Sequence, residues 1–183
     1  MAQTEPQTIA KLLGAFPTTS LHASKSALIV IGAQKEYSDI GKLNVKNFEK
    51  TIGNIRRLVE FYHANGMPVL YTRQSALGNT LFTEGSKQAE FIDALQPGKA
   101  DMVLGQITPD AFVVGFETHT YISATAMTAS NQGYHVIVIK DGVSDRDLPG
   151  ATGEEVTKVT LKGLEDLFET AQTSDLMSKA IRR

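Results

Sequence analysis

Short apolar runs rich in β-branched residues alternate along this chain with longer stretches of helical periodicity, and this alternation limits the possible folds more than any other feature. The clearest runs are residues 26–31 and 135–139. Their lack of polar alternation predicts strands buried on both faces. Between them, apolar residues from Val45 to Tyr62 recur at helical spacing. The pattern predicts a three-layer α/β domain with a mostly parallel sheet and helices on both faces.

The rest of the chain continues this pattern. Further strands are expected at 68–71, 102–104, 111–114 and 168–170, and further helices at 86–95, at 119–132, from Thr152, and from a cap at Ser174. Thr152 and Glu155 have the spacing of a capping box. A turn-rich segment is expected over 141–153. Because 183 residues without repeats or linkers suit one hydrophobic core, we expect a single domain over 1–183.

One connection breaks the alternation. Only the six residues 105–110 separate the expected strands 102–104 and 111–114. Parallel neighbours need a crossover of a dozen or more residues, so these two runs cannot form an ordinary βαβ unit. Either one run lies outside the main sheet, or a crossover helix present in related folds is missing. The sequence does not decide whether the short connection is a true deletion or an artefact of the gene model.

Composition excludes several classes of function. The net charge is -2 and long Lys/Arg runs are absent, which argues against a nucleic-acid partner and a polybasic membrane surface. The apolar run 27–31 is too short to cross a bilayer, and the polar N-terminus is broken by Pro6, so we expect a cytoplasmic protein. The chain has no cysteine, which excludes disulfides, thiolate metal ligands and a thiol nucleophile.

Several segments resemble those of a known family. They are residues 27–34 (ALIVIGAQ), 115–126 (GFETHTYISATA), 132–144 and 145–156. In this order, from about residue 21 to 176, the chain is similar to the isochorismatase-like hydrolases of the cysteine hydrolase superfamily. The resemblance implies hydrolysis of an amide, ester or vinyl-ether-like centre by an Asp, a Lys and a nucleophilic Cys. It also implies assembly into dimers or larger homo-oligomers.

The residues at the three catalytic places differ from those of the family. Gly32 stands where the resemblance puts the Asp, Tyr121 stands where it puts the Cys, and Gln106 is the nearest occupant of the Lys place. Glycine has no acid, and a phenol with a pKa near ~10 is a poor nucleophile unless a neighbour activates it. We therefore expect no covalent cysteine-type mechanism.

A replacement acid–base set can come only from the turn that contains the old nucleophile place. Its candidates are Tyr121, His119 and Glu117. Tyr121 can act as an acid or an activated phenolate at a helix N-terminus, or its ring can simply fill the pocket. His119 can act as a base, or as a hydrogen-bonding residue that supports the site.

Ligands of such folds bind at the carboxyl ends of the strands. The substrate-binding candidates in that crevice are Gly32, Gln34, Arg73 and Thr118. Three of them have a structural alternative: loop packing for Gln34, a surface position for Arg73 and helix capping for Thr118. The charged segment 145–147 is expected to form a local ion-pair network first, and an acid–base pair second.

The sequence gives no reason to expect a cofactor or a metal. The four histidines have no ligand spacing, and no glycine-rich nucleotide motif occurs. Three functions stay open. The chain acts on or binds a small carbonyl or carboxylate metabolite without covalent cysteine chemistry, or it is an inactive family member that binds a metabolite or a partner subunit. The third alternative is a truncated gene product.

Overall fold

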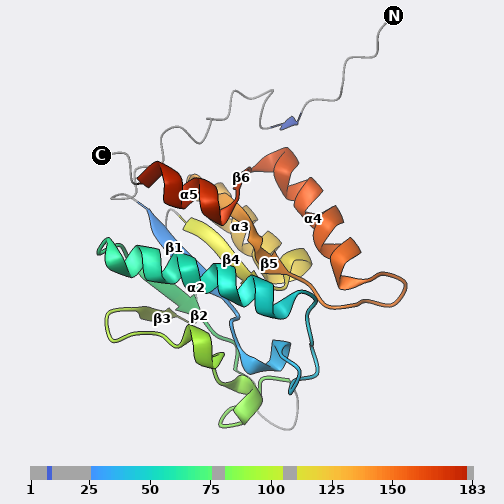
Figure 1. Cartoon of the computed structure of the whole chain (residues 1–183). Coiled ribbons are helices and arrows are strands. Elements are labelled where there is room, and N and C mark those ends of the chain that lie inside the picture. Colours follow the sequence, from blue (N-terminus) through green and yellow to red (C-terminus); the bar gives the residue numbers. More distant parts are fainter. Residues whose placement is uncertain (1–7, 10–25, 76–80, 105–110, 181–183) are drawn as a thin grey trace, which may run out of the picture.

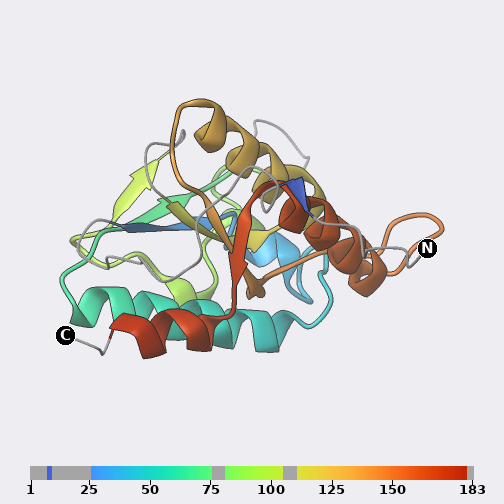
Figure 2. The same cartoon turned by 90° about the horizontal axis from the view of Figure 1, so that it is seen from above.

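The structure is a computed structural model that describes residues 8–9, 26–75, 81–104 and 111–180 (Figure 1). Within this part, one central sheet is covered by helices on both faces. Figure 2, seen from above, shows the sheet between two helical layers. The three-layer α/β arrangement predicted from the sequence is thus confirmed.

The sheet has six strands in the order β3-β2-β1-β4-β5-β6, and every neighbouring pair is parallel. The strands are β1 (Ala27–Ile31), β2 (Val69–Thr72), β3 (Met102–Leu104), β4 (Ala111–Phe116), β5 (Ile137–Ser144) and β6 (Glu169–Ala171). β1 and β4 lie at the centre, which explains why their sequences are almost wholly apolar.

In the part of the chain that the structure describes, four α-helices complete the layers. They are α2 (Phe48–Ala64), α3 (Ser123–Asn131), α4 (Gly153–Leu167) and α5 (Thr173–Ala180). α2 and α5 lie side by side on one face of the sheet, and α3 and α4 cover the other (Figure 2). In the described part of the chain, no helix is both long and apolar enough to cross a membrane.

Side chains of β1 alternate between two cores. Leu28 and Val30 face the cluster that includes Ile55 of α2, whereas Ile29 and Ile31 face the cluster of α3 and α4. Because successive strand residues point to opposite faces, a wholly apolar strand buries both of its faces. Packing against both cores fixes the position of β1 along its own axis, and therefore the position of its carboxyl end.

The backbones of β1 and β4 approach each other closely where Ile31 pairs with Gly115. Gly115 has a φ of 126°, and a Cβ atom there would lie 2.0 Å from the carbonyl oxygen of Ile31. Only glycine fits such an approach. This contact brings the segments that follow the two strands to one edge of the sheet.

The two strand candidates flanking the short connection both belong to the sheet, so the alternative that one of them lies outside it is wrong. β3 and β4 are separated by β2 and β1, and the connection at 105–110 lies outside the described residues. Its six residues are too few for a crossover helix of the usual length.

The helix predicted at 86–95 is wrong. The structure has two 3₁₀ turns, Lys87–Ala89 and Asp93–Leu95, with extended backbone between them. The amide of Lys35 donates to the carbonyl of Glu90, and the amide of Ile92 donates to the carbonyl of Ala33. The backbone of 90–92 therefore pairs with the loop after β1 instead of continuing a helix.

Other predicted ends of strands and helices differ less from the observed ones. β5 continues to Ser144, beyond the predicted end at 139, so the first residues of the expected turn region are strand. The predicted capping box at Thr152 and Glu155 is confirmed. The last helix begins at Thr173, one residue before the predicted cap at Ser174.

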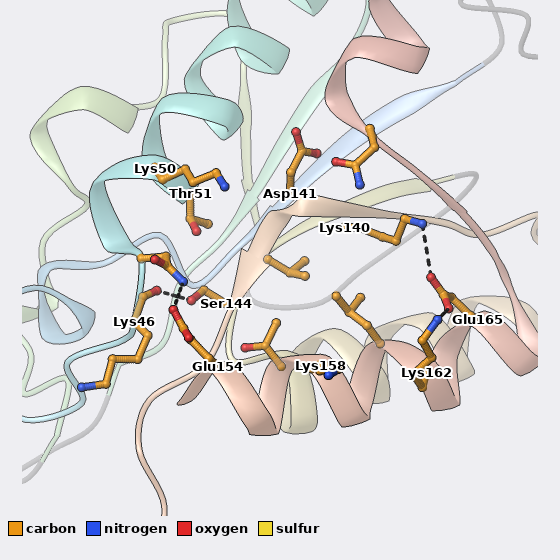
Figure 3. Close-up of a pocket in the computed structure, with 15 residues that line it drawn as sticks. Lys46, Lys50, Thr51, Lys140, Asp141, Ser144, Glu154, Lys158, Lys162 and Glu165 are labelled. Atoms are coloured by element: carbon orange, nitrogen blue, oxygen red, sulfur yellow. Dashed lines mark hydrogen bonds and ion pairs between the residues drawn. The ribbon is translucent and has the colours of Figure 1, made fainter. Parts of the chain in front are cut away.

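A groove of about 490 Å³ lies between α2 and α4 (Figure 3). It forms because β6 pairs only with Ile137–Ile139 of β5, so that no described strand covers the outer edge of β5 beyond Ile139. Lys140 and Val143 of this uncovered part line the groove.

Candidate functional site

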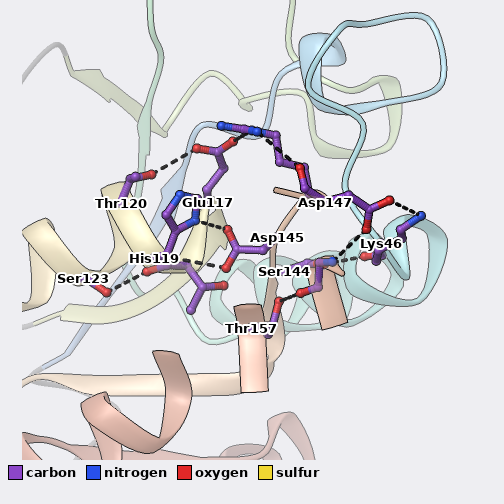
Figure 4. Close-up of polar contacts among 12 residues, drawn as sticks. Lys46, Glu117, His119, Thr120, Ser123, Ser144, Asp145, Asp147 and Thr157 are labelled. Atoms are coloured by element: carbon purple, nitrogen blue, oxygen red, sulfur yellow. Dashed lines mark hydrogen bonds and ion pairs between the residues drawn. The ribbon is translucent and has the colours of Figure 1, made fainter. Parts of the chain in front are cut away.

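Three polar segments meet where β1, β4 and β5 end. Gly32 follows β1, Glu117 follows β4 and Asp145 follows β5. Because carboxyl ends of neighbouring parallel strands share one edge of the sheet, these residues lie together, at the place where α/β proteins bind ligands. Figure 4 shows the polar contacts around Glu117 and Asp145.

His119 and Asp145 form the central pair of this edge. The Nδ1 atom of His119 lies 2.5 Å from Oδ1 of Asp145, and the backbone amide of His119 donates to Oδ2 at 3.2 Å (Figure 4). Asp145 is completely buried, whereas 23% of the His119 side chain is exposed. A carboxylate accepts from the ring N–H at Nδ1, so the Nε2 atom of the neutral ring is free to accept a proton.

Two opposing effects act on the pKa of Asp145. Burial raises the pKa of its carboxyl above the ordinary value, and the hydrogen bonds from His119 act in the opposite direction. A buried carboxylate requires such partners, because an unpaired one costs several kcal/mol. Asp145 is therefore suited to hold the imidazole in one orientation.

Glu117 forms a second ion pair at this edge of the sheet, with Arg146. Its Oε1 atom accepts from Nε of Arg146 at 2.6 Å, and its Oε2 atom accepts from the hydroxyl of Thr120 at 3.1 Å. The side chain is almost fully buried. Both carboxylate oxygens are thus occupied by protein donors, and Glu117 holds the Arg146 guanidinium at the edge of the site.

The space beside Gly32 is filled by Tyr37. A Cβ atom at Gly32 would lie 3.4 Å from the Tyr37 ring, 3.9 Å from its hydroxyl and 3.1 Å from the carbonyl oxygen of Phe116. Gly32 also has a φ of 57°, which favours glycine. Tyr37 is fully buried, and its ring packs against Phe82 and Phe116 at centroid distances of 5.5 Å.

The hydroxyl of Tyr37 has no hydrogen-bond partner among the described residues. Burial raises its pKa well above the ordinary value, and the nearby Glu117 carboxylate and Tyr121 phenol act in the same direction, against Arg146. Tyr37 therefore stays neutral and keeps its proton. It is a buried donor on which the charges of Glu117 and Arg146 act.

Tyr121 lies in a π-helical segment, Thr118–Ile122, immediately before α3. It is 39% exposed and makes no hydrogen bond with the described part of the chain, so its hydroxyl does not reach His119 or Glu117. The ring also does not fill the place beside Gly32, since Tyr37 does. Of the predicted catalytic candidates, only His119 has an oriented acid–base partner.

The predicted substrate-binding residues fall into different environments. Gln34 is completely buried; its amide nitrogen donates to the carbonyls of Gln74 and Ala89, and its amide oxygen accepts from the Gln74 amide. Arg73 is exposed just after β2. The contact of these two residues with a substrate stays a prediction.

Thr118 is fully buried beneath this edge. Its suggested role as helix cap is wrong, because the helical segment begins at Thr118 itself and Glu117 occupies the capping position. Gln106, the predicted occupant of the Lys place, lies outside the described residues.

Sequence reasoning missed Tyr37, Asp145 and Arg146 as members of the site. Asp145 carried little signal, because the strand predicted at 135–139 ends well before it and only the extension of β5 to Ser144 brings Asp145 beside the turn that follows β4. The predicted ion-pair network around 145–147 is present: Arg146 pairs with Glu117, and Asp147 pairs with Lys46 at 2.8 Å. The sequence did not predict the pairing of Asp145 with His119, which lies outside the segment 145–147.

Among the described residues, no group of three or more His, Asp or Glu side chains is arranged to hold a metal ion. The expected absence of a metal or cofactor stays a prediction.

Comparison with known proteins identifies the family. The model of the isochorismatase domain matches residues 26–174. The chain belongs to the isochorismatase family. The secreted isochorismatase effector Isc1 of Verticillium dahliae is 34% identical over 182 residues, covering 89% of this chain and 95% of that protein.

Solved structures agree with this assignment. An isochorismatase from Pseudomonas putida has a TM-score of 0.82 and 26% identity, covering 93% of this chain and 98% of that one. A cysteine hydrolase from Pseudomonas syringae has a TM-score of 0.78, covering 97% and 99% of the two chains, and its 17% identity shows the fold alone. This isochorismatase-family chain thus keeps the fold while containing no cysteine.

The packing beside Gly32 predicts that an acid cannot simply be restored there. Gly32→Ala and Gly32→Asp should each lower the free energy of unfolding by about 1 kcal/mol or more, because a Cβ atom is strained at this φ and crowded by Phe116 and Tyr37. Urea unfolding measures the change.

Gly53→Ala is the matched control. A Cβ atom at Gly53 of α2 would meet nothing within 4 Å, so this variant should be stabilised by up to about 1 kcal/mol. A Gly32→Asp variant as stable as the wild type would contradict the proposed constraint.

Proposed function

We propose that this isochorismatase-family protein hydrolyses a small carbonyl or carboxylate metabolite by general-base catalysis, without a covalent cysteine intermediate. The observation that carries the proposal is the His119–Asp145 pair, in which a buried carboxylate lies 2.5 Å from Nδ1 of a partly exposed imidazole. The arrangement supports a base at Nε2, because the Asp fixes both the tautomer and the ring orientation.

The proposed reaction needs no group beyond substrate and water. For an amide or ester substrate, Nε2 of His119 takes a proton from water while the water oxygen bonds to the carbonyl carbon. The bond to the leaving group then breaks, and the imidazolium returns the proton to the leaving atom. Asp145 stabilises the positive imidazolium in between.

Tyr37 is the proposed donor to the substrate oxygen. Negative charge grows on that oxygen as water attacks, and a fixed donor in a dry site stabilises it. The buried Tyr37 hydroxyl has no partner in the described part of the chain. Because Tyr37 is fully buried, contact of a substrate with its hydroxyl requires neighbouring side chains to move. Tyr121 and Arg146, which both act on the pKa of Tyr37, are partly exposed.

Binding without turnover is the second candidate. It is favoured by Gly32, which supplies no acid, and by the Tyr37 ring packed beside it. A metabolite-binding protein tolerates both features. Whether the protein hydrolyses its ligand or only binds it, the proposed partner is a small molecule, and neither a nucleic acid nor a membrane is part of the proposal.

Assembly into homo-oligomers and a cytoplasmic location also stay proposals. The Verticillium dahliae relative is described as secreted, so the compartment of this chain needs its own measurement.

His119→Gln should lower kcat/KM by about 10²–10⁴-fold on any substrate the wild type hydrolyses, because the variant has no general base. Asp145→Asn should also lower it, since an amide cannot stabilise the imidazolium in the same way. The assay measures turnover of isochorismate, nicotinamide and simple amides and esters by the purified protein.

His63→Gln is the control for this experiment. His63 forms a similar pair with Asp101 at 2.7 Å. Asp101 directly precedes β3, at the opposite edge of the parallel sheet from the turn that follows β4, so loss of His63 should leave turnover unchanged. Equal activity of wild type and His119→Gln would refute general-base catalysis by His119, and no turnover on the whole panel would favour the binding candidate.

Tyr37→Phe should have opposite effects on stability and on turnover. Removing a buried hydroxyl without a partner should raise the free energy of unfolding by about 1 kcal/mol. Losing the donor to the substrate oxygen should lower kcat by about 10²-fold. Thermal unfolding and steady-state kinetics measure the two effects.

Tyr71→Phe is the matched variant. Tyr71 of β2 is also fully buried with an unpartnered hydroxyl among the described residues, so it should gain stability too. Its turnover should not change, because Tyr71 lies outside the site. If Tyr37→Phe behaves like Tyr71→Phe in both measurements, Tyr37 has no role in the reaction.

A further inference from the structure

The groove between α2 and α4 is rich in positive charge. Of the 18 Lys and Arg residues in the chain, five line this groove: Lys46, Lys50, Lys140, Lys158 and Lys162. Three acidic residues, Asp141, Glu154 and Glu165, also line it. The groove is therefore net positive in a chain whose net charge is -2.

The acidic residues of the groove are already engaged by protein donors. Asp141 accepts from the amide and the hydroxyl of Thr173 at 2.8 and 3.0 Å. Glu154 accepts from the side-chain amide of Asn47 at 2.9 Å. Their charge is partly satisfied within the protein, which leaves them less able to neutralise further lysines.

Three of the five lysines are paired. Glu165 holds Lys162 at 2.6 Å and Lys140 at 3.2 Å, and Lys46 lies 2.8 Å from Asp147. Lys50 and Lys158 form neither a hydrogen bond nor an ion pair with the described residues. They extend from opposite walls of the groove, Lys50 from α2 and Lys158 from α4 (Figure 3).

The groove also offers an apolar surface between its two charged walls. Val143 of β5 and Leu161 of α4 line it together with the lysines. Its volume of about 490 Å³ lies within the range of small-molecule sites. A concave surface of one sign concentrates ligands of the opposite sign.

We propose that this groove binds a small organic phosphate, whose anionic group contacts Lys50 and Lys158 and whose carbon skeleton packs on Val143 and Leu161. A phosphate oxygen forms charge-assisted hydrogen bonds with lysine ammonium groups, which are stronger than neutral ones. The site is separate from the His119–Asp145 pair and does not depend on the proposed hydrolysis.

The test is a titration of the full chain followed by amide NMR, with phenyl phosphate as the probe. Phenyl phosphate should shift the resonances of Lys50, Val143 and Lys158, and its affinity should fall as salt is added. Inorganic phosphate should bind more weakly, because it lacks the apolar skeleton. Benzyl alcohol, which lacks the charge, should leave these resonances unshifted.

The Lys50→Gln/Lys158→Gln variant should bind phenyl phosphate about tenfold more weakly or worse, because two charge-assisted contacts are lost. Lys87→Gln/Lys99→Gln removes the same charge at exposed positions outside the groove and should keep the wild-type affinity. Absence of binding to the wild type would overturn the proposal. So would equal binding by the Lys50/Lys158 and Lys87/Lys99 variants, or inorganic phosphate binding as tightly as phenyl phosphate.

Discussion

The hydrogen bonds between Asp145 and His119 connect the end of β5 to the turn that follows β4, and the candidate site is organised around them. Asp145 is fully buried, so its carboxylate depends on the two N–H donors of His119 for compensation. The same contacts fix the imidazole relative to the sheet. One interaction thus joins two strands and orients the partly exposed imidazole of His119.

Near this pair, an aromatic cluster lies beside Gly32, which follows β1. Gly32 has no side chain, and the ring of Tyr37 occupies the space beside it, held by Phe82 and Phe116. Phe48 stacks on Phe116 at 6.0 Å and extends this aromatic cluster toward α2. An aromatic cluster contributes apolar burial where an acid would need charged partners. The packing beside Gly32 is therefore satisfied without an acid.

Much of the fold could be predicted from the sequence, because buried strands and amphipathic helices have distinct apolar periods. The helix expected at 86–95 failed since the backbone of 90–92 pairs with residues 33–35, a contact between distant segments that local propensity does not contain. The site was predicted in part. His119 and Glu117 were found from their position in the nucleophile turn, but Asp145 and Tyr37 become site residues only through long-range packing.

The proposed base requires a neutral His119 that carries its proton on Nδ1. Nitrogen-15 NMR of the imidazole reports directly which ring nitrogen carries the proton in the neutral form. If Asp145 accepts from Nδ1, the neutral ring is protonated at Nδ1 and unprotonated at Nε2, and Asp145→Asn alters this pattern. A neutral ring protonated at Nε2, or a spectrum unchanged by Asp145→Asn, would contradict the proposed base.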